Sequence, residues 1–486
     1  MTEPCELSAV AARRLIGAKK LSPVELLESC IKRIELVDGA VNAVTAIDVA
    51  AARKAARRAK ADVMSGGALD ILHGLPIAVK DLEATGGLRT TYGSVLYKDN
   101  VPAADQPSVA NVRDAGGVIL CKTNTPEFGA GGNSRNDVHG ATGNPFDPTK
   151  TCGGSSGGSA VALATGMAPL ATGSDYGGSL RTPSSFCGVV GFRPSPGLVP
   201  SVDKAAALTP WGVIGPMGRS VEDAHLLLLA QADYDKRDPF SGDDYARLPE
   251  ALSGIDLASV RVAISVDLGC APVDSNIRKT FTERVGTFRG VFAEAQDRDP
   301  DLGPQIHDVF EILRGLTFLT SHHDRLKKTP DKLGPNVTYH TQRGLERSAA
   351  DVAWAQVEQG KIMKRYMALF DEVDVLIAPA ASVSPFPHSQ WHPTEMNGEK
   401  LDNYMRWLAI SYGITMALTV SASIPCGVDH LGMPFGIQVA GPNGSDAIVL
   451  EIAHSLERHL AANKATARPL PDLNKLAGKG KPKAMA

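Results

Sequence analysis

The chain contains 486 residues, of which 43% are hydrophobic and 21% are charged, and its formal net charge is −3. This balance is typical of a globular protein rather than a disordered one, and the length allows one large domain or two or three smaller ones. Because positive and negative charges are mixed along the chain without a broad basic face, the composition argues against nucleic acid as the main partner.

The N-terminal sequence lacks the apolar core of a signal peptide, which predicts a cytoplasmic protein. Seven cysteines are scattered without CxxC spacing, and an odd number favours reduced thiols over a disulfide framework or a structural zinc site. The longest apolar run, residues 407–425, contains Ser, Thr, Tyr and Gly and is typical of buried core rather than of a membrane span. We therefore expect no membrane association and no bound metal.

Residues 1–65 predict a helical lead-in to the domain. Ser22 is suited to cap a helix, Glu25 closes a capping box with it, and Gly39 is expected to end the helix. A second helix, rich in Ala, Arg and Lys, is predicted over residues 46–64, with its charges on a solvated face.

Short β-branched segments then alternate with helical segments across residues 66–200. Residues 75–82 are bounded by turn residues and predict a buried strand that ends near Lys80, an unusual place for a lysine. The pattern then predicts, in chain order, a helix over 105–117, a strand over 118–124, a loop rich in Gly, Asn and Pro over 129–150 and a helix over about 158–166. Strands that alternate with helices indicate an α/β sheet covered by helices on both faces.

The mixed pattern continues without a low-complexity linker or an internal repeat, which favours a single domain over residues 1–486. The predicted elements are a strand over 259–267, a helix over 349–373, strands over 374–379, 419–428 and 433–441, and a helix over 445–460. The basic residues 466–486 predict a flexible, solvated tail.

The stretch CGGSSGGSAV, residues 152–161, places four glycines and three serines directly before an Ala-rich helix. It lacks the lysine of a phosphate-binding P-loop, and it follows a polar segment with two prolines instead of the strand that a GxSxG hydrolase elbow requires. Taken alone, it is also compatible with simple packing of a helix end against a sheet. A second Gly-Gly-Ser turn ends at Ser179, and its successive amides are suited to bind an oxyanion.

These two serine loops need a base, and the histidines do not obviously supply one. No histidine cluster with catalytic or metal-ligand spacing is evident, and the adjacent pair His322 and His323 is interpreted as ordinary surface or helix chemistry. Cys152 and Cys187 flank the loops, but without a partnered histidine a packing role is favoured over a thiol mechanism. Lys80, at the end of its predicted strand, is the better candidate for the base.

Four motifs in this region resemble the amidase signature family, whose members are Ser-cisSer-Lys hydrolases. The motifs are GLPIAVKDL, CKTNTPEFG, GGSSGGSAVALATG and GSDYGGSLRTPSSFCGVVGFRPS, all within residues 74–200, and weaker similarity extends to DVLIAPA and SIPCGVDHLGMPFGIQVAGP. The resemblance implies the amidase signature fold, an α/β fold with a single large mixed β-sheet covered by helices on both faces. It also implies a catalytic core over 66–200, a variable substrate-determining region over 200–400 and a C-terminal part of the core over 400–465.

By position in these motifs, the resemblance implies that Lys80 is the catalytic lysine, that Ser155 is the bridging serine, whose preceding peptide is cis in the family, and that Ser179 is the nucleophile. A free lysine has a pKa of about 10.4, so burial must lower it before the neutral amine can accept a proton at neutral pH. Ser155 would then relay the proton of Ser179, whose oxygen attacks an amide carbonyl. The backbone N–H groups expected to hold the oxyanion belong to Tyr176, Gly177, Gly178 and Ser179. No metal or organic cofactor is implied.

The resemblance also implies a supporting hydrogen-bond shell around the serines, formed by Ser156, Asp175 and Arg181. Within this shell, Arg181 is expected to orient Ser155 or the loop. Tyr176 departs from the Thr or Ile that many relatives carry before the Gly-Gly-Ser turn, and its ring is expected either to line the pocket or to pack.

The substrate is the least legible property of the sequence. In the family, substrate choice is set by the region that corresponds to residues 200–425. The aromatic residues that either line a pocket or belong to the core are Phe128, Tyr339, Trp354, Trp391 and Trp407.

Three functions compete for this sequence. The leading one is a stand-alone amidase that cleaves an aryl or aliphatic acylamide to an acid and an amine or ammonia. The alternative is the glutamine-hydrolysing component of a tRNA-dependent amidotransferase, which works with partner subunits. A catalytically silent binding protein is a third hypothesis, against which the presence of all three catalytic residues argues. The expected partner is a small-molecule amide, and a homodimer is implied by the resemblance alone.

Overall fold

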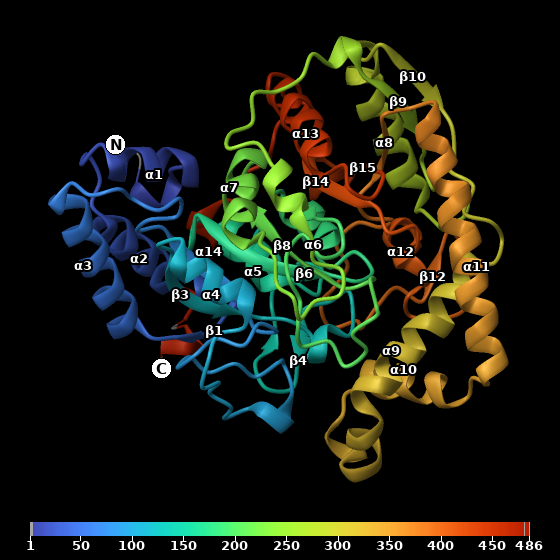
Figure 1. Cartoon of the computed structure of the whole chain (residues 1–486), viewed down its shortest axis with the longest axis horizontal. Coiled ribbons are helices and arrows are strands. Elements are labelled where there is room, and N and C mark those ends of the chain that lie inside the picture. The colour runs from blue at the N-terminus through green and yellow to red at the C-terminus, as the bar shows by residue number, and fades with distance from the viewer. Residues whose placement is uncertain (1–2, 481, 486) are drawn as a thin grey trace.

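The computed structural model describes residues 3–480 and 482–485, and its centre is one mixed sheet of eleven strands (Figure 1). In spatial order the strands are β1 (Val44–Ile47), β3 (Val118–Thr123), β2 (Pro76–Lys80), β6 (Leu170–Asp175), β8 (Val213–Gly218), β7 (Val190–Arg193), β14 (Val420–Val428), β15 (Pro434–Gly441), β11 (Val375–Pro379), β9 (Arg261–Ile264) and β10 (Glu294–Asp297). The pairing is parallel from β3 through β2 to β6 and from β11 through β9 to β10, and antiparallel elsewhere. This mixed sheet is the one that the resemblance implies.

Fourteen α-helices of the described chain surround this sheet. They are α1 (Ala9–Gly17), α2 (Pro23–Val41), α3 (Val49–Ser65), α4 (Pro107–Asp114), α5 (Gly157–Ala164), α6 (Arg181–Cys187), α7 (Val221–Gln231), α8 (Ser275–Phe288), α9 (Ile306–Lys328), α10 (Pro335–Leu345), α11 (Ala349–Ala368), α12 (Ala409–Met416), α13 (Asp446–Ala461) and α14 (Leu473–Leu476). In Figure 1 the N-terminal helices α1 to α3 flank one end of the sheet, and α9 to α11 flank the other.

Apolar, β-branched strands and small-residue helices explain where the core lies. Every residue of β2, β3 and β15 is buried, as expected for strands that are covered on both faces. Helix α5 packs against β2, β3 and β6, α6 packs against β7, β14 and β15, and both helices are buried along their whole length. Helices α7 and α13 pack against each other and cover β8 and β14. The predicted α/β architecture is therefore confirmed.

Helix α2 continues past the residue that was expected to end it. Its capping box at Ser22 and Glu25 is present as predicted, but the helix ends at Val41 and not at Gly39. Asn42 adopts the left-handed conformation that stops the helix, and its N–H donates to the Asp38 carbonyl oxygen at 2.7 Å. A Cβ atom at Gly39 would overlap the backbone of the C-terminal segment, so this glycine serves a close approach of two chain segments.

The lead-in also contributes a strand that the sequence pattern did not reveal. Ala46 and Ile47, predicted as the start of the second helix, belong to β1, which pairs antiparallel with β3 at one edge of the sheet. Asp48 sets the start of α3 instead, because its carboxylate accepts a hydrogen bond from the Ala51 N–H at 2.9 Å. The Ala-rich composition after this cap drew the predicted helix three residues too far toward the N-terminus.

The described part of the tail is packed, so the prediction of a flexible, solvated tail over residues 466–486 is wrong there. Thr466 and Leu476 are buried, and α14 packs against α2. Arg468 donates from Nε to the Gly188 carbonyl oxygen at 2.7 Å. The short 3₁₀ helix η10 (Lys483–Met485) packs against β1. The basic composition concealed these apolar anchors.

The apolar run at residues 407–425 is core, as predicted. It starts at Trp407, which is fully buried, and continues through α12 into β14. In the portion of the chain that the structure covers, no helix combines the length and the apolar character needed to cross a membrane. The loop at 129–150 contains a small hairpin, formed by β4 (Arg135–Asn136) and β5 (Gly140–Ala141). A second hairpin is formed by β12 (Glu395–Met396) and β13 (Glu399–Lys400).

Candidate active site

Two parallel strands bring the predicted lysine next to the second serine loop. Strand β2 ends at Lys80 and β6 ends at Asp175, and the two strands are neighbours with Ile77 opposite Leu170. The carboxyl ends of neighbouring parallel strands meet at the same edge of a sheet, which is where ligands of open α/β sheets bind. Lys80 therefore lies at the same edge as the loop that carries Ser179.

Lys80 is fully buried and is surrounded by hydroxyl groups. Its Nζ atom lies 2.7 Å from Ser155 Oγ, 2.8 Å from Ser156 Oγ and 2.9 Å from Ser174 Oγ. Burial lowers the pKa of Lys80 to about 7, although the carboxylates of Glu83 and Asp175 act in the opposite direction. A neutral amine is thus available near neutral pH, within hydrogen-bond reach of Ser155.

The glycines of the first serine loop are required by close contacts. The Gly154–Ser155 peptide bond is cis, as the resemblance implies. A Cβ atom at Gly157 would lie 2.5 Å from Cys152 Sγ, and one at Gly158 would overlap the backbone of Asn124 at the end of β3. Only glycine lets the first turn of α5 approach the sheet this closely, and this approach positions Ser155 at Lys80.

The second serine loop is held by the Asp175 carboxylate. The carboxylate oxygens accept hydrogen bonds from the Gly178 and Leu180 N–H groups, each at 3.0 Å. Arg181 adds two further bonds, from Nε at 3.1 Å and from Nη2 at 2.9 Å. Ser179 lies between the two bonded amides, at the start of α6. Burial alone would raise the pKa of Asp175, but the neighbouring guanidinium groups hold it well below its usual range.

The four amides expected to bind an oxyanion are not equivalent. The Gly178 N–H donates to Asp175, so it is already occupied and the expectation for this group is corrected. Within the described chain, no hydrogen-bond acceptor is found for the N–H groups of Tyr176, Gly177 or Ser179. These three amides remain the candidates for binding a negatively charged oxygen.

Arg181 orients the loop and makes no contact with Ser155. Besides Asp175, its Nη1 atom donates to the Ser411 carbonyl oxygen at 2.9 Å and to Gln438 Oε1 at 3.1 Å, which ties the loop to α12 and β15. Sequence reasoning missed a second guanidinium at this place. Arg193, fully buried in β7, donates from Nη1 to the Asp175 carbonyl oxygen at 2.8 Å. A charged residue inside the apolar GFR strand was the available signal.

A buried polar network behind Lys80 was also missed. The Glu83 carboxylate accepts hydrogen bonds from the hydroxyl groups of Thr172 and Ser108, the latter at 3.0 Å. The Thr172 hydroxyl in turn accepts the Lys80 backbone N–H at 3.1 Å. Lys122 is fully buried on β3 and donates from Nζ to the Glu83 carbonyl oxygen. Burial raises the pKa of Glu83 and lowers that of Lys122 to about 8.

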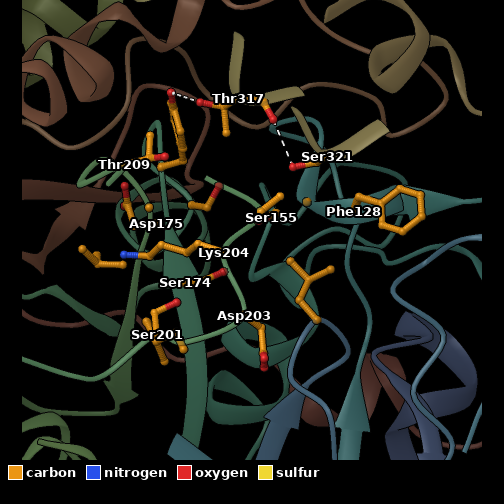
Figure 2. Close-up of a pocket in the computed structure, with 18 of the residues that line it drawn as sticks. Phe128, Ser155, Ser174, Asp175, Ser201, Asp203, Lys204, Thr209, Thr317 and Ser321 are labelled. Carbon is orange, nitrogen blue, oxygen red and sulfur yellow. Dashed lines mark hydrogen bonds between the residues drawn. The ribbon is translucent and has the colours of Figure 1, made fainter. Parts of the chain in front are cut away.

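A cavity of about 300 Å³ opens onto Ser155 and Ser179 (Figure 2). Leu82 and Phe128 form an apolar wall, and Figure 2 shows Phe128 on the side of Ser155. The Tyr176 ring lines the cavity from another side, and its hydroxyl lies 3.3 Å from Thr317 Oγ1 on α9. Both alternatives for Tyr176 therefore hold, since the ring lines the pocket and also packs.

The remaining candidate aromatic residues lie outside this cavity. Trp407 is in the core, Trp354 is exposed on α11, Trp391 stacks with Arg135 at a distance of 4.2 Å, and Tyr339 packs edge-on against Tyr404. Phe128 alone among the five candidates lines the cavity that contains Ser155 and Ser179.

The cysteines beside the loops are packing residues, as predicted. Cys152 and Cys187 are both fully buried, and burial raises the pKa of each thiol, in Cys152 to about 12. The cavity thus holds a buried amine of lowered pKa, a serine bonded to it and a second serine whose hydroxyl makes no hydrogen bond with the described residues. This arrangement is suited to activating a hydroxyl group as a nucleophile.

Comparison with known proteins agrees with this geometry. The sequence model of the family described as Amidase matches residues 25–450. The chain is 32% identical to an acylamidase of Rhodococcus erythropolis over 93% of its own length and 95% of that protein. It is also 31% identical to the GatA-type component of the glutamyl-tRNA(Gln) amidotransferase of Psychrobacter sp. strain PRwf-1, over 90% of its own length and 93% of that protein.

A solved structure shows the same fold. A bacterial aryl acylamidase of the amidase signature enzymes superposes with a TM-score of 0.85 at 27% sequence identity, and the match covers 96% of this chain and 99% of that one.

Proposed function

The chain belongs to the amidase family and is a hydrolase of linear C–N amide bonds, and from this premise we propose that it cleaves an aryl or aliphatic acylamide through an acyl-enzyme on Ser179. The 2.7 Å contact between Lys80 Nζ and Ser155 Oγ carries the proposal, because it joins an amine of lowered pKa to a hydroxyl that opens onto the cavity. The similarity to acylamidases supports the substrate class.

The first half of the reaction forms the acyl-enzyme. Neutral Lys80 accepts the proton of the Ser155 hydroxyl, and Ser155 accepts the proton of the Ser179 hydroxyl. The Ser179 oxygen then bonds to the amide carbon, and the carbonyl oxygen becomes an oxyanion within reach of the free N–H groups of Tyr176, Gly177 and Ser179. The C–N bond breaks as the leaving nitrogen receives a proton through Ser155 from Lys80.

The second half restores the enzyme. Water enters the place of the departed amine and gives a proton through Ser155 to Lys80, while its oxygen bonds to the acyl carbon. The ester bond to Ser179 breaks, the serine oxygen regains a proton and the carboxylic acid leaves. Each proton taken up by Lys80 is returned in the same half-reaction, so the steps balance without a further reactant.

The second candidate function is the glutamine-hydrolysing component of a tRNA-dependent amidotransferase. The similarity to these amidotransferase components favours it, since it also extends over most of both chains. The two functions differ in what the isolated chain does, because a stand-alone acylamidase needs no partner protein to cleave anilides.

The experiment is a panel of anilides, aliphatic amides and glutamine, incubated with the purified chain alone, with amine or ammonia release as the readout. We expect turnover of anilides or aliphatic amides that is abolished in Ser179→Ala and nearly abolished in Lys80→Ala. Wild-type rates in either variant would contradict the assigned roles. Release of ammonia from glutamine alone, or activity that requires added partner subunits, would favour the amidotransferase.

We also propose a cytoplasmic location. All seven cysteines are free thiols in the structure, which suits a reducing compartment.

A further inference from the structure

The cavity carries a positive charge that the proposed chemistry does not use. Lys204 lies in the loop of residues 201–209, and this loop lines the cavity together with the catalytic serines. In Figure 2 the Lys204 side chain is extended on the opposite side of the view from Phe128, with its nitrogen farthest from that ring. The cavity therefore has an apolar wall at Phe128 and a cationic wall at Lys204.

The ammonium group of Lys204 has no ionic partner within the described chain. It contacts the Phe240 ring, whose centroid lies 5.5 Å from Nζ. The nearby Asp238 carboxylate is occupied by backbone amides, since it accepts the N–H groups of Ser201 at 2.8 Å and Phe240 at 3.0 Å. Asp203 also lines the cavity but is exposed, and Figure 2 shows its carboxylate directed away from the Lys204 nitrogen.

The protein on this side of the cavity has surplus positive charge. Arg181 and Arg193 share the single carboxylate of Asp175, and Arg193 keeps two buried nitrogens, Nε and Nη2, without a partner among the described residues. Arg314 is 4% exposed and lies behind Tyr176, with Cζ 5.1 Å from the ring centroid. Its Nε donates to His340 Nε2 at 2.8 Å, and no carboxylate of the described residues pairs with it.

A cation that is shielded from water gains free energy from an anionic partner, because a charged hydrogen bond is about twice as strong as a neutral one. Burial lowers the pKa of Lys204, which agrees with an ammonium that has lost part of its hydration. The described chain supplies no anion at this place, whereas a ligand in the cavity would lie against it.

We propose that Lys204 binds a carboxylate of the substrate, so that the preferred amides carry an anionic group toward the loop of residues 201–209 and an apolar group toward Phe128. The inference rests on the proposed amide hydrolysis and specifies its substrate class. Lys204 acts as a specificity-determining residue and takes no part in the bond-breaking steps.

The test uses pairs of amides that differ in one charge. 4-Acetamidobenzoate and 4-methylacetanilide place the difference on the amine side, and N-phenylsuccinamate and butyranilide place it on the acyl side. We expect the wild-type enzyme to prefer the anionic member of at least one pair by kcat/KM. Lys204→Met should lower that preference by about 10- to 100-fold, the range for a hydrogen bond to a charged group, and Lys204→Arg should retain most of it.

Lys236→Met is the matched control, because Lys236 is an exposed lysine of the same region that lies outside the cavity. It should leave the preference unchanged. The proposal is overturned if the wild-type enzyme prefers the neutral member of both pairs, or if Lys204→Met leaves the preference where it was.

Failure of amide hydrolysis itself gives a different result, namely no turnover of any amide by the wild-type chain. The binding of N-phenylsuccinamate and 4-acetamidobenzoate to Ser179→Ala, measured by calorimetry against their neutral counterparts, then decides the inference separately. A preference for the anion that disappears in Ser179→Ala/Lys204→Met supports it, and equal binding of the charged and neutral compounds overturns it.

Discussion

The burial of Lys80 predicts the pH dependence of catalysis. Only the neutral amine can accept a proton, so kcat/KM should rise with pH and level off above the pKa of Lys80, which burial lowers from 10.5 to about 7. With that pKa, the neutral fraction is about 1% at pH 5, about 50% at pH 7 and about 99% at pH 9. We therefore expect kcat/KM to fall about 100-fold between pH 9 and pH 5.

The assay is the initial rate of hydrolysis of a neutral anilide between pH 5 and pH 10 at constant ionic strength. A neutral anilide does not titrate in this range, so the profile reports the enzyme. Each sample is returned to pH 7 and assayed again, which separates reversible titration from unfolding. An inflection near pH 10, where an exposed lysine titrates, or a profile that does not vary with pH would refute the reasoning.

Three further substitutions test the structure around the site. Glu83→Gln should move the inflection to lower pH, because the Glu83 carboxylate raises the pKa of Lys80, and an unmoved inflection would remove Glu83 from that role. Gly157→Ala should lower the free energy of unfolding by about 1–3 kcal/mol through overlap with Cys152, whereas Gly286→Ala, which meets no atom within 4 Å, should not; equal melting temperatures would contradict this. Asp175→Asn should cost about 3–5 kcal/mol in a denaturant titration, because it leaves two buried guanidinium groups uncompensated, while the exposed pair partner in Glu372→Gln should change little.

Much of the fold was legible because its strands are short, apolar and bounded by turn residues. The segment 75–82 predicted β2 and the position of Lys80 at its end, and the segment 433–441 predicted β15. Strand β1 could not be read in this way, because its four residues stand directly before an Ala-rich helix and their pairing with β3 is a long-range contact.

The candidate site was predicted less completely. The motifs identified Lys80, Ser155 and Ser179, and the structure brings the first two into contact. Motifs do not show that the Gly178 N–H is occupied, which depends on the direction of one carboxylate. They also do not show Glu83 or Arg193, because a buried charge is recognised by its surroundings and not by its residue type.

The packed tail has a consequence for the order in which the chain can complete its fold. Strand β1 lies at an edge of the sheet, and η10 covers it from the far end of the chain, with Lys483 Nζ 3.2 Å from the His139 carbonyl oxygen. An uncovered edge strand is a template for pairing with other chains. During synthesis on the ribosome, the edge at β1 therefore stays open until nearly the whole described chain has emerged, and the tail acts as a late seal against self-association of the nascent protein.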